Sequence, residues 1–305
     1  MLVGEILHKV SKLIIVVVFI LSIALLMSTS FYKNNVMVNK GEEQTYFYNG
    51  NKNIECLYYN TADFLNVKEY NLNKDAGTIH GCIVPHHLLA KDLIHEVFQN
   101  IKKDEYKTVV LIGPDHESVN KGKIFTTLSD YQTPMGILET DDKITSELLK
   151  NSFIIANDEK LTKEHSTSSI VPFIKNYLDD VKVITLVLTK QVTLEDIDLL
   201  VEKLYENVNM DETLFIASVD FSHYLDLDNA NKMDLISMDA IKNKDIKRIM
   251  TFNNDNLDSP NSVVTMLKMM DKAKLNGNVL NNSNSELILK DNINETTSYI
   301  TYLFY

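Results

Sequence analysis

At 305 residues, the chain is long enough for one large domain or two small ones, because single cores stop growing at about 250 to 300 residues. Its 45% hydrophobic and 24% charged residues match an ordinary globular protein, which excludes a wholly disordered chain. The formal charge of −12, from 42 acidic and 30 basic side chains, opposes the phosphate backbone of nucleic acids and argues against a nucleic-acid partner.

A strongly apolar segment lies near the N-terminus. Residues 13–27 read LIIVVVFILSIALLM, with Ser22 as their only polar side chain. They follow Lys9 and Lys12, which the positive-inside rule places in the cytoplasm. We therefore expect a cytoplasmic N-terminus over 1–12 and a transmembrane anchor or signal segment over 13–31, about the length needed to cross a bilayer. A buried core helix fits less well, because the segment has no polar face.

The residues that follow bear on where the protein is located. Ser28 and Ser30 are small residues at a potential cleavage site, so a cleaved signal peptide is the alternative to an anchor. Residues 32–53, rich in Asn, Lys, Gly and Glu, are typical of a spacer. The sequence predicts a single-pass protein of the cell membrane with its domain outside the cytoplasm, or a secreted protein if the signal is cleaved.

The remainder, 54–305, alternates short β-branched runs with longer segments of helical periodicity, which is typical of an α/β domain. The expected strands are 78–84, 108–112, 181–188, 213–218 and 298–304, and the expected helices are 88–101, 144–151, 168–178, 194–205, 229–243 and 262–274. We expect a single domain with a central mixed or parallel sheet flanked by helices. Cys56 and Cys82 lie outside any CxxC spacing, which argues against a zinc ribbon and leaves one bridge between them open.

Three of the expected strands end in histidine-bearing segments. One runs into Pro85-His86-His87, the next into Gly-Pro-Asp-His116, and a third into Val-Asp220-Phe-Ser-His223. Ligands of an open α/β sheet bind beyond the carboxyl ends of its strands, so these side chains should meet at one edge. Adjacent side chains at a strand end point in different directions, and we expect His86 rather than His87 to face the site, with His87 able to replace or assist it.

A fourth histidine, His165, follows Glu164 at the start of an expected helix. Any one of these histidines alone would be read as hydrogen-bonded in a loop, but four in equivalent places favour a metal, since imidazole is the commonest transition-metal ligand. Asp220 and Glu164 are suited to orient the rings, and an acid beside His223 is typical of a general base. A serine hydrolase is disfavoured, because no GxSxG elbow occurs, and phosphate-binding loops are absent.

In chain order, the blocks IVPHH, LIGPDHE, TPMG, KEHS and SVDFSHY resemble those of the Memo family, also called AmmeMemoRadiSam system protein B, over residues 77–305. The resemblance implies a fold similar to the class III extradiol dioxygenases. It also implies that His86 and His116 are metal ligands, that His223 takes the place of the dioxygenase base, and that Glu164 and His165 line the cleft. Iron is the expected metal, with copper or zinc as alternatives.

The chain departs from the family pattern in two places. Many relatives carry a cysteine just before a C-terminal helix, where this sequence reads Leu-Asp258-Ser259-Pro. We expect Ser259 in the place of the thiol, with Asp258 as a substitute carboxylate. The second departure is His87, in place of a small residue, which could supply the missing ligand.

The leading hypothesis is a membrane-anchored metal protein, outside the cytoplasm, with redox or dioxygenase-like chemistry. His86 and His116, supplemented by His87 or Ser259, would hold the metal. The alternatives are a non-catalytic module that binds a peptide or small molecule in the same cleft, and a metal-dependent hydrolase. The sequence does not name the substrate.

Overall fold

The computed structural model describes residues 53–70, 77–117, 122–291 and 294–305, which belong to one compact unit over Lys52–Tyr305. The predicted anchor at 13–31 lies outside these residues, as do 1–12 and nearly all of the predicted spacer. No helix in the described ranges is both long and apolar enough to span a bilayer.

An eight-stranded mixed sheet forms the centre of this unit. Its strands, in spatial order, are β10 (Gly277–Asn284), β11 (Ser298–Phe304), β2 (Gly81–Val84), β9 (Thr213–Ser218), β3 (Thr108–Pro114), β8 (Lys182–Leu188), β4 (Ile124–Thr126) and β7 (Ile154–Ala156). The four strands β2, β9, β3 and β8 run parallel, whereas β11 pairs antiparallel with both β2 and β10. The parallel strands are almost entirely buried, which explains their unbroken apolar sequences.

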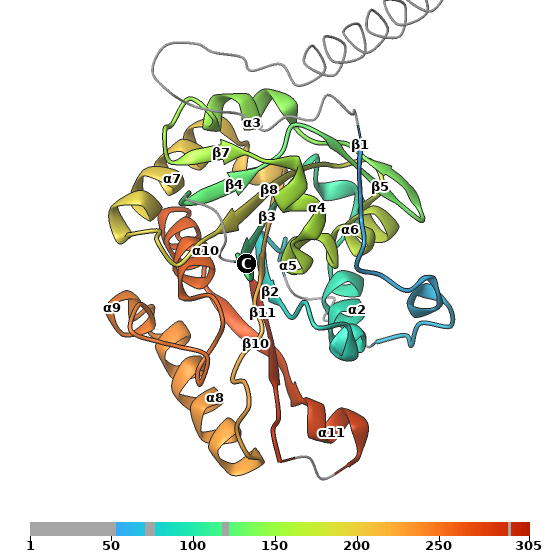
Figure 1. Ribbon diagram of the computed structural model, residues 1–305, viewed down its shortest axis with the longest axis vertical. Helices are drawn as coiled ribbons and strands as arrows, with labels where there is room; N and C mark the ends of the chain where they lie inside the picture. Colours follow the sequence, from blue (N-terminus) through green and yellow to red (C-terminus); the bar gives the residue numbers. More distant parts are fainter. Residues whose placement is uncertain (1–52, 71–76, 118–121, 292–293) are drawn as a thin grey trace, which may run out of the picture. The chain divides into compact units, whose positions relative to one another are not determined.

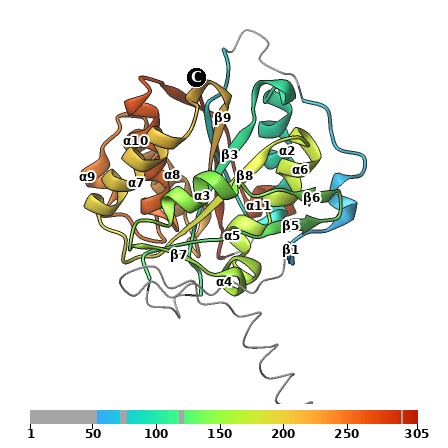
Figure 2. The same ribbon diagram turned by 90° about the horizontal axis from the view of Figure 1, so that it is seen from above.

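A second, three-stranded sheet consists of β1 (Asn53–Glu55), β5 (Asp130–Thr133) and β6 (Gly136–Leu138). The helices are α2 (Lys91–Asn100), α3 (Asp142–Leu148), α4 (Asp158–Lys163), α5 (His165–Ser168), α6 (Val171–Leu178), α7 (Leu194–Asn207), α8 (Leu227–Lys242), α9 (Ile246–Ile249), α10 (Pro260–Lys272) and α11 (Ser285–Leu289). In both views α7, α8 and α10 lie on one side of the large sheet and α2 and α6 on the other (Figures 1 and 2). The prediction of a single mixed α/β domain is confirmed for the described residues.

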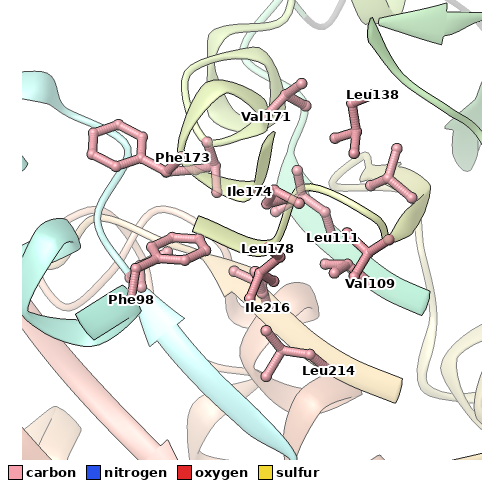
Figure 3. Packing of buried hydrophobic residues seen from close by; sticks show 14 of the residues in the cluster. Phe98, Val109, Leu111, Leu138, Val171, Phe173, Ile174, Leu178, Leu214 and Ile216 are labelled. Carbon is pink, nitrogen blue, oxygen red and sulfur yellow. The ribbon is translucent and has the colours of Figure 1, made fainter. Parts of the chain in front are cut away.

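The main hydrophobic core fills the space between the sheet and the α2–α6 layer. Phe98 of α2 and Phe173 of α6 contribute its large side chains, and Leu111 of β3 and Ile216 of β9 rise from the sheet to meet this layer (Figure 3). Each of these four is at most 1% exposed. The core holds the parallel strands in register and so fixes the positions of the residues that follow their carboxyl ends.

The two cysteines and one helix cap complete the description of the fold. Cys56 and Cys82 are both buried and free, so no bridge forms between them. Asp141 accepts a hydrogen bond from the backbone N–H of Ile144 at the start of α3, 3.1 Å away, and therefore caps a helix.

Candidate metal centre

His86 lies two residues beyond the end of β2 and is only 3% exposed. Its Nδ1 atom is 3.2 Å from the hydroxyl of Ser218, at the end of β9, and that hydroxyl donates its own hydrogen to the backbone carbonyl of Ser166, 2.5 Å away. Because a carbonyl cannot donate, the Ser218 oxygen accepts from the Nδ1–H of His86. In the neutral ring the Nε2 atom therefore keeps its lone pair, which is the state that a metal requires.

His116 is held in the same tautomer by a different group. It follows the end of β3, and its Nδ1 donates to Glu164 Oε1 at 2.8 Å, while its backbone N–H donates to Glu164 Oε2 at 2.8 Å. Burial lowers the pKa of His116, but its hydrogen bonds with Asp258 and Glu164 outweigh this effect and raise the pKa to about 10. Burial raises the pKa of Glu164, but the contacts with His116 lower it to about 2.

The short helix α5 brings His165 beside these two rings. Its N-cap is Glu164, whose carboxylate accepts from the backbone N–H of Ser166 at 2.9 Å. A Cβ atom at Gly113 of β3 would lie 2.6 Å from the hydroxyl oxygen of Ser166, so the close approach of α5 to the end of β3 depends on glycine. The ring of His165 stacks on that of His116 with centroids 4.1 Å apart, and its centroid is 5.3 Å from that of His86.

His165 differs electrostatically from its two neighbours. Burial and the positive charge of His116 and His86 lower its pKa to about 4, so this ring is neutral across the physiological range. Its side chain is 40% exposed, compared with 31% for His116 and 2% for His86. The cluster is therefore buried at His86 and opens to solvent at His165.

Two carboxylates complete the cluster from the segments after β9 and before α10. An isolated antiparallel bridge joins Phe221 to Leu257, and the backbone N–H of Asp258 donates to the carbonyl of Asp220 at 3.1 Å. Asp220 Oδ1 accepts from the backbone N–H of His86 at 3.0 Å, and its Oδ2 lies 3.6 Å from His86 Nε2. This backbone pairing places Asp258 beside the histidines.

Asp258 faces both imidazoles at once. Its Oδ2 atom lies 3.2 Å from His86 Nε2 and 3.6 Å from His116 Nε2. Its other oxygen, Oδ1, is buried and has no hydrogen-bond partner among the described residues. Burial raises the pKa of Asp258, but the positive charge of His86 and the hydrogen bond with His116 outweigh it and hold the pKa well below its ordinary value.

The donor set fits a divalent cation. One group of ligand atoms comes from His86, His116 and His165 and another from His86, Asp220 and Asp258, and within each group the atoms lie within 4.8 Å of one another. Two Nε2 atoms, each of which could bind a metal after losing its proton, converge on one carboxylate oxygen, and the other oxygen of that carboxylate is buried and has no hydrogen-bond partner among the described residues. Both features are expected where a metal would replace the missing contacts.

A family profile described as Memo-like protein matches residues 52–302 of the chain. The chain belongs to the Memo family. A MEMO1 family protein of Methanococcus maripaludis is 28% identical to it over 208 residues, and one of Nitrosopumilus maritimus is 24% identical over 219 residues. These alignments cover 64% and 70% of this chain and 72% and 78% of the relatives. The chain is also similar to the crystal structure of an uncharacterized protein from Escherichia coli K12, with a TM-score of 0.49 and 10% sequence identity. The superposition includes 73% of this chain and 99% of the Escherichia coli protein.

Of the two neighbours considered for the third ligand, Asp258 is the one that faces the histidines. Ser259, the expected replacement, is the N-cap of α10: its hydroxyl donates to Ser262 Oγ at 2.6 Å and accepts from the Ser262 backbone N–H at 3.3 Å. The hydroxyl is thus used within the helix, whereas Asp258 meets both imidazoles. The sequence analysis favoured Ser259 and named Asp258 as a substitute carboxylate.

Two other predicted residues lie apart from the cluster. His87 turns its Nδ1 atom to the hydroxyl of Tyr299, 2.6 Å away, and only its backbone N–H reaches Asp220 Oδ1, at 3.5 Å. His223 is half-buried, its backbone N–H donates to the carbonyl of Asn254, and its buried Nδ1 has no hydrogen-bond partner in the part of the chain that the structure describes. The structure thus brings together His86, His116, His165, Glu164, Asp220 and Asp258.

A buried lysine that the sequence reasoning missed supports the His116 loop. Lys160 of α4 is 1% exposed, and its Nζ forms an ion pair with Asp115 and lies 3.5 Å from Glu117 Oε2. These two acids flank His116 in sequence, and Glu164, four residues after Lys160, binds His116 itself. Contacts from α4 and its C-cap therefore hold three consecutive residues after β3. Lysine in a polar segment is ordinarily exposed, so the sequence carried no signal for this role.

Proposed function

We propose that this Memo protein is a metal-dependent redox protein that holds a divalent metal, iron, through His86, His116 and Asp258. The observation that carries the proposal is the convergence of both Nε2 atoms on Asp258 Oδ2, at 3.2 and 3.6 Å. Two histidines and one carboxylate with open positions are the ligand set of non-haem iron oxygenases. The carboxylate is a harder ligand than the thiolate that many relatives carry, which favours iron over copper. When bound, iron would supply electron transfer and oxygen activation.

The remaining residues of the site prepare the ligands and handle protons. Ser218 and Glu164 fix the two rings with Nδ1 protonated, so that Nε2 is available without a tautomer change. His165, 40% exposed at the open side of the cluster, is the histidine that a substrate would reach first. Asp220 holds the backbone of His86. His223 remains a predicted base whose role depends on the substrate.

We also propose that the domain is carried outside the cytoplasm by an uncleaved anchor at 13–31. The support is the apolar run at 13–27 and the two lysines that precede it, Lys9 and Lys12. Fractionation and protease treatment of intact cells test this. Membrane-bound protein that external protease digests supports the anchor, whereas soluble released protein lacking residues 1–31 supports cleavage.

The metal proposal is tested by mass-spectrometric metal analysis of the full-length chain purified without added metal. We expect near-stoichiometric iron that is lost in the double variant His86→Ala, His116→Ala. His87→Ala serves as the matched control, because its ring is bound to Tyr299, and it should retain the metal. Metal missing from every sample, even after anaerobic reconstitution with iron(II), would refute the proposal and favour the binding module. Zinc in place of iron, with hydrolysis that needs no oxygen, would favour the hydrolase.

A further inference from the structure

A cavity of about 290 Å³ adjoins the metal centre. Its walls come from the end of β3, from the loop after β8 and from the segment between α9 and α10. Asp258 belongs both to this lining and to the histidine cluster, so an occupant would lie beside the proposed metal. The volume is about ten times the roughly 30 Å³ that one water molecule takes up in the liquid, which suits a ligand of about ten non-hydrogen atoms.

About half of the lining residues are apolar. Leu188, Val192 and Leu257 are at most 4% exposed, and Met250 and Phe252 are half-buried. The exposed parts of Met250 and Phe252 favour a ligand with an apolar body, because covering them removes hydrocarbon from water.

Three carboxamides belong to the polar part of the lining. Asn261 donates through Nδ2 to the carbonyl of Thr189 at 2.9 Å, and Asn253 accepts through Oδ1 from the backbone N–H of Asp255 at 2.8 Å. Their positions are thereby fixed, and Asn254 lies beside them. These groups add hydrogen-bonding capacity without adding charge.

The charges around the cavity favour an anion. Both acids in the lining are engaged: Asp115 with Lys160, and Asp258 with His86 and His116. Lys190 also lines the cavity, and none of the described residues forms an ion pair with it. Among the described residues, a ligand would therefore meet one ammonium group without an ion-pair partner at the loop after β8, and the proposed metal would lie beside Asp258.

We propose that the cavity binds a small organic acid, with its carboxylate at Lys190, its apolar body against Met250 and Phe252, and its far end beside Asp258. The role of this acid as a ligand of the metal centre rests on the proposed function. Binding of the acid requires only the cavity.

The probes are phenylacetate and its uncharged isostere phenylacetamide, each with ten non-hydrogen atoms. Dissociation constants are measured by ligand-detected NMR on the full-length, metal-free chain, with an empty-micelle blank. We expect phenylacetate to bind up to about fivefold more tightly than phenylacetamide, since about fivefold is the upper range for an exposed ion pair. Lys190→Met should remove this preference and leave phenylacetamide binding unchanged, while Lys190→Arg should retain it. Lys232→Met, an exposed lysine of α8, is the control.

A second variant locates the site. Asn254 is exposed at the cavity, and Asn254→Trp should weaken both probes by narrowing it. Equal affinity for acid and amide, or tight binding that Asn254→Trp leaves intact, would overturn the inference. So would a chain that binds iron but neither probe, which would leave the proposed function standing. Phenylacetate binding by a chain that takes up no metal would support the cavity and refute the metal proposal alone.

Discussion

Removing the charge of Lys160 should destabilise the fold strongly. Its side chain and that of Asp115 are 0% and 1% exposed, and the two form an ion pair next to His116. Breaking a buried pair by removing one partner costs about 3–5 kcal/mol, because the other charge stays buried. We expect Lys160→Met to lower the free energy of unfolding by about that amount. For a domain of this size, this corresponds to a fall in Tm of about 6–20 °C.

The assay is urea unfolding of the metal-free, full-length chain followed by circular dichroism. The double variant Lys160→Met, Asp115→Asn should recover most of the loss, since it removes both charges and keeps an acceptor for the backbone N–H of Glu117. Lys163→Met on the same helix removes a solvent-exposed pair with Glu159 and should leave the midpoint unchanged. A single variant as stable as the parent, or a double variant less stable than the single, would refute the reasoning.

Three further predictions concern the metal centre. Asp258→Asn should weaken iron binding by at least about 100-fold, measured by chelator competition, because it removes the anionic ligand. Ser259→Ala should leave iron binding unchanged, because the Ser259 hydroxyl is used within α10. Similar losses of affinity in both variants would contradict the assignment of Asp258 as the ligand. Asp258→Cys should shift the preference toward copper(I) and zinc in competition with iron, since thiolate is a softer ligand, and an unchanged order of metals would count against Asp258 as a ligand. In the metal-free chain the pKa of His116 is raised from 6.5 to about 10, so its contribution to stability is complete below pH 6.5 and is lost as the pH rises toward 10. The urea midpoint should fall across that range and the slope should flatten in His116→Gln; an equal slope in both would show that another group is responsible.

The predicted strands at 213–218 and 298–304 agree with β9 and β11 residue for residue, and the helix expected at 194–205 is α7 (Leu194–Asn207). These segments could be predicted from the sequence because burial on one or both faces requires a strong apolar pattern. β10 (Gly277–Asn284) was missed for the opposite reason. Its sequence, GNVLNNSN, is rich in asparagine and lies at the sheet edge, where backbone pairing with β11 forms a strand without β propensity.

In the candidate site, too, some features could be predicted from the sequence and others could not. Strand ends are visible in sequence, so His86, His116 and Asp220 could be expected at one edge of the sheet. The side-chain directions of adjacent residues were not visible. Asp258 and Ser259 are neighbours, yet one meets the imidazoles and the other caps α10, because the bridge from Phe221 to Leu257 and the helix start together fix the backbone between them.

The sequence by itself determined the α/β class, the family resemblance and the apolar N-terminal segment, because each depends on residue type and spacing along the chain. Only the tertiary structure decided which residues share the site. The contact of Glu164 with His116 and of Asp258 with both histidines joins segments 48 or more residues apart. The buried pair of Lys160 with Asp115 likewise depends on α4 packing against the end of β3, since burial and proximity are properties of the packed chain.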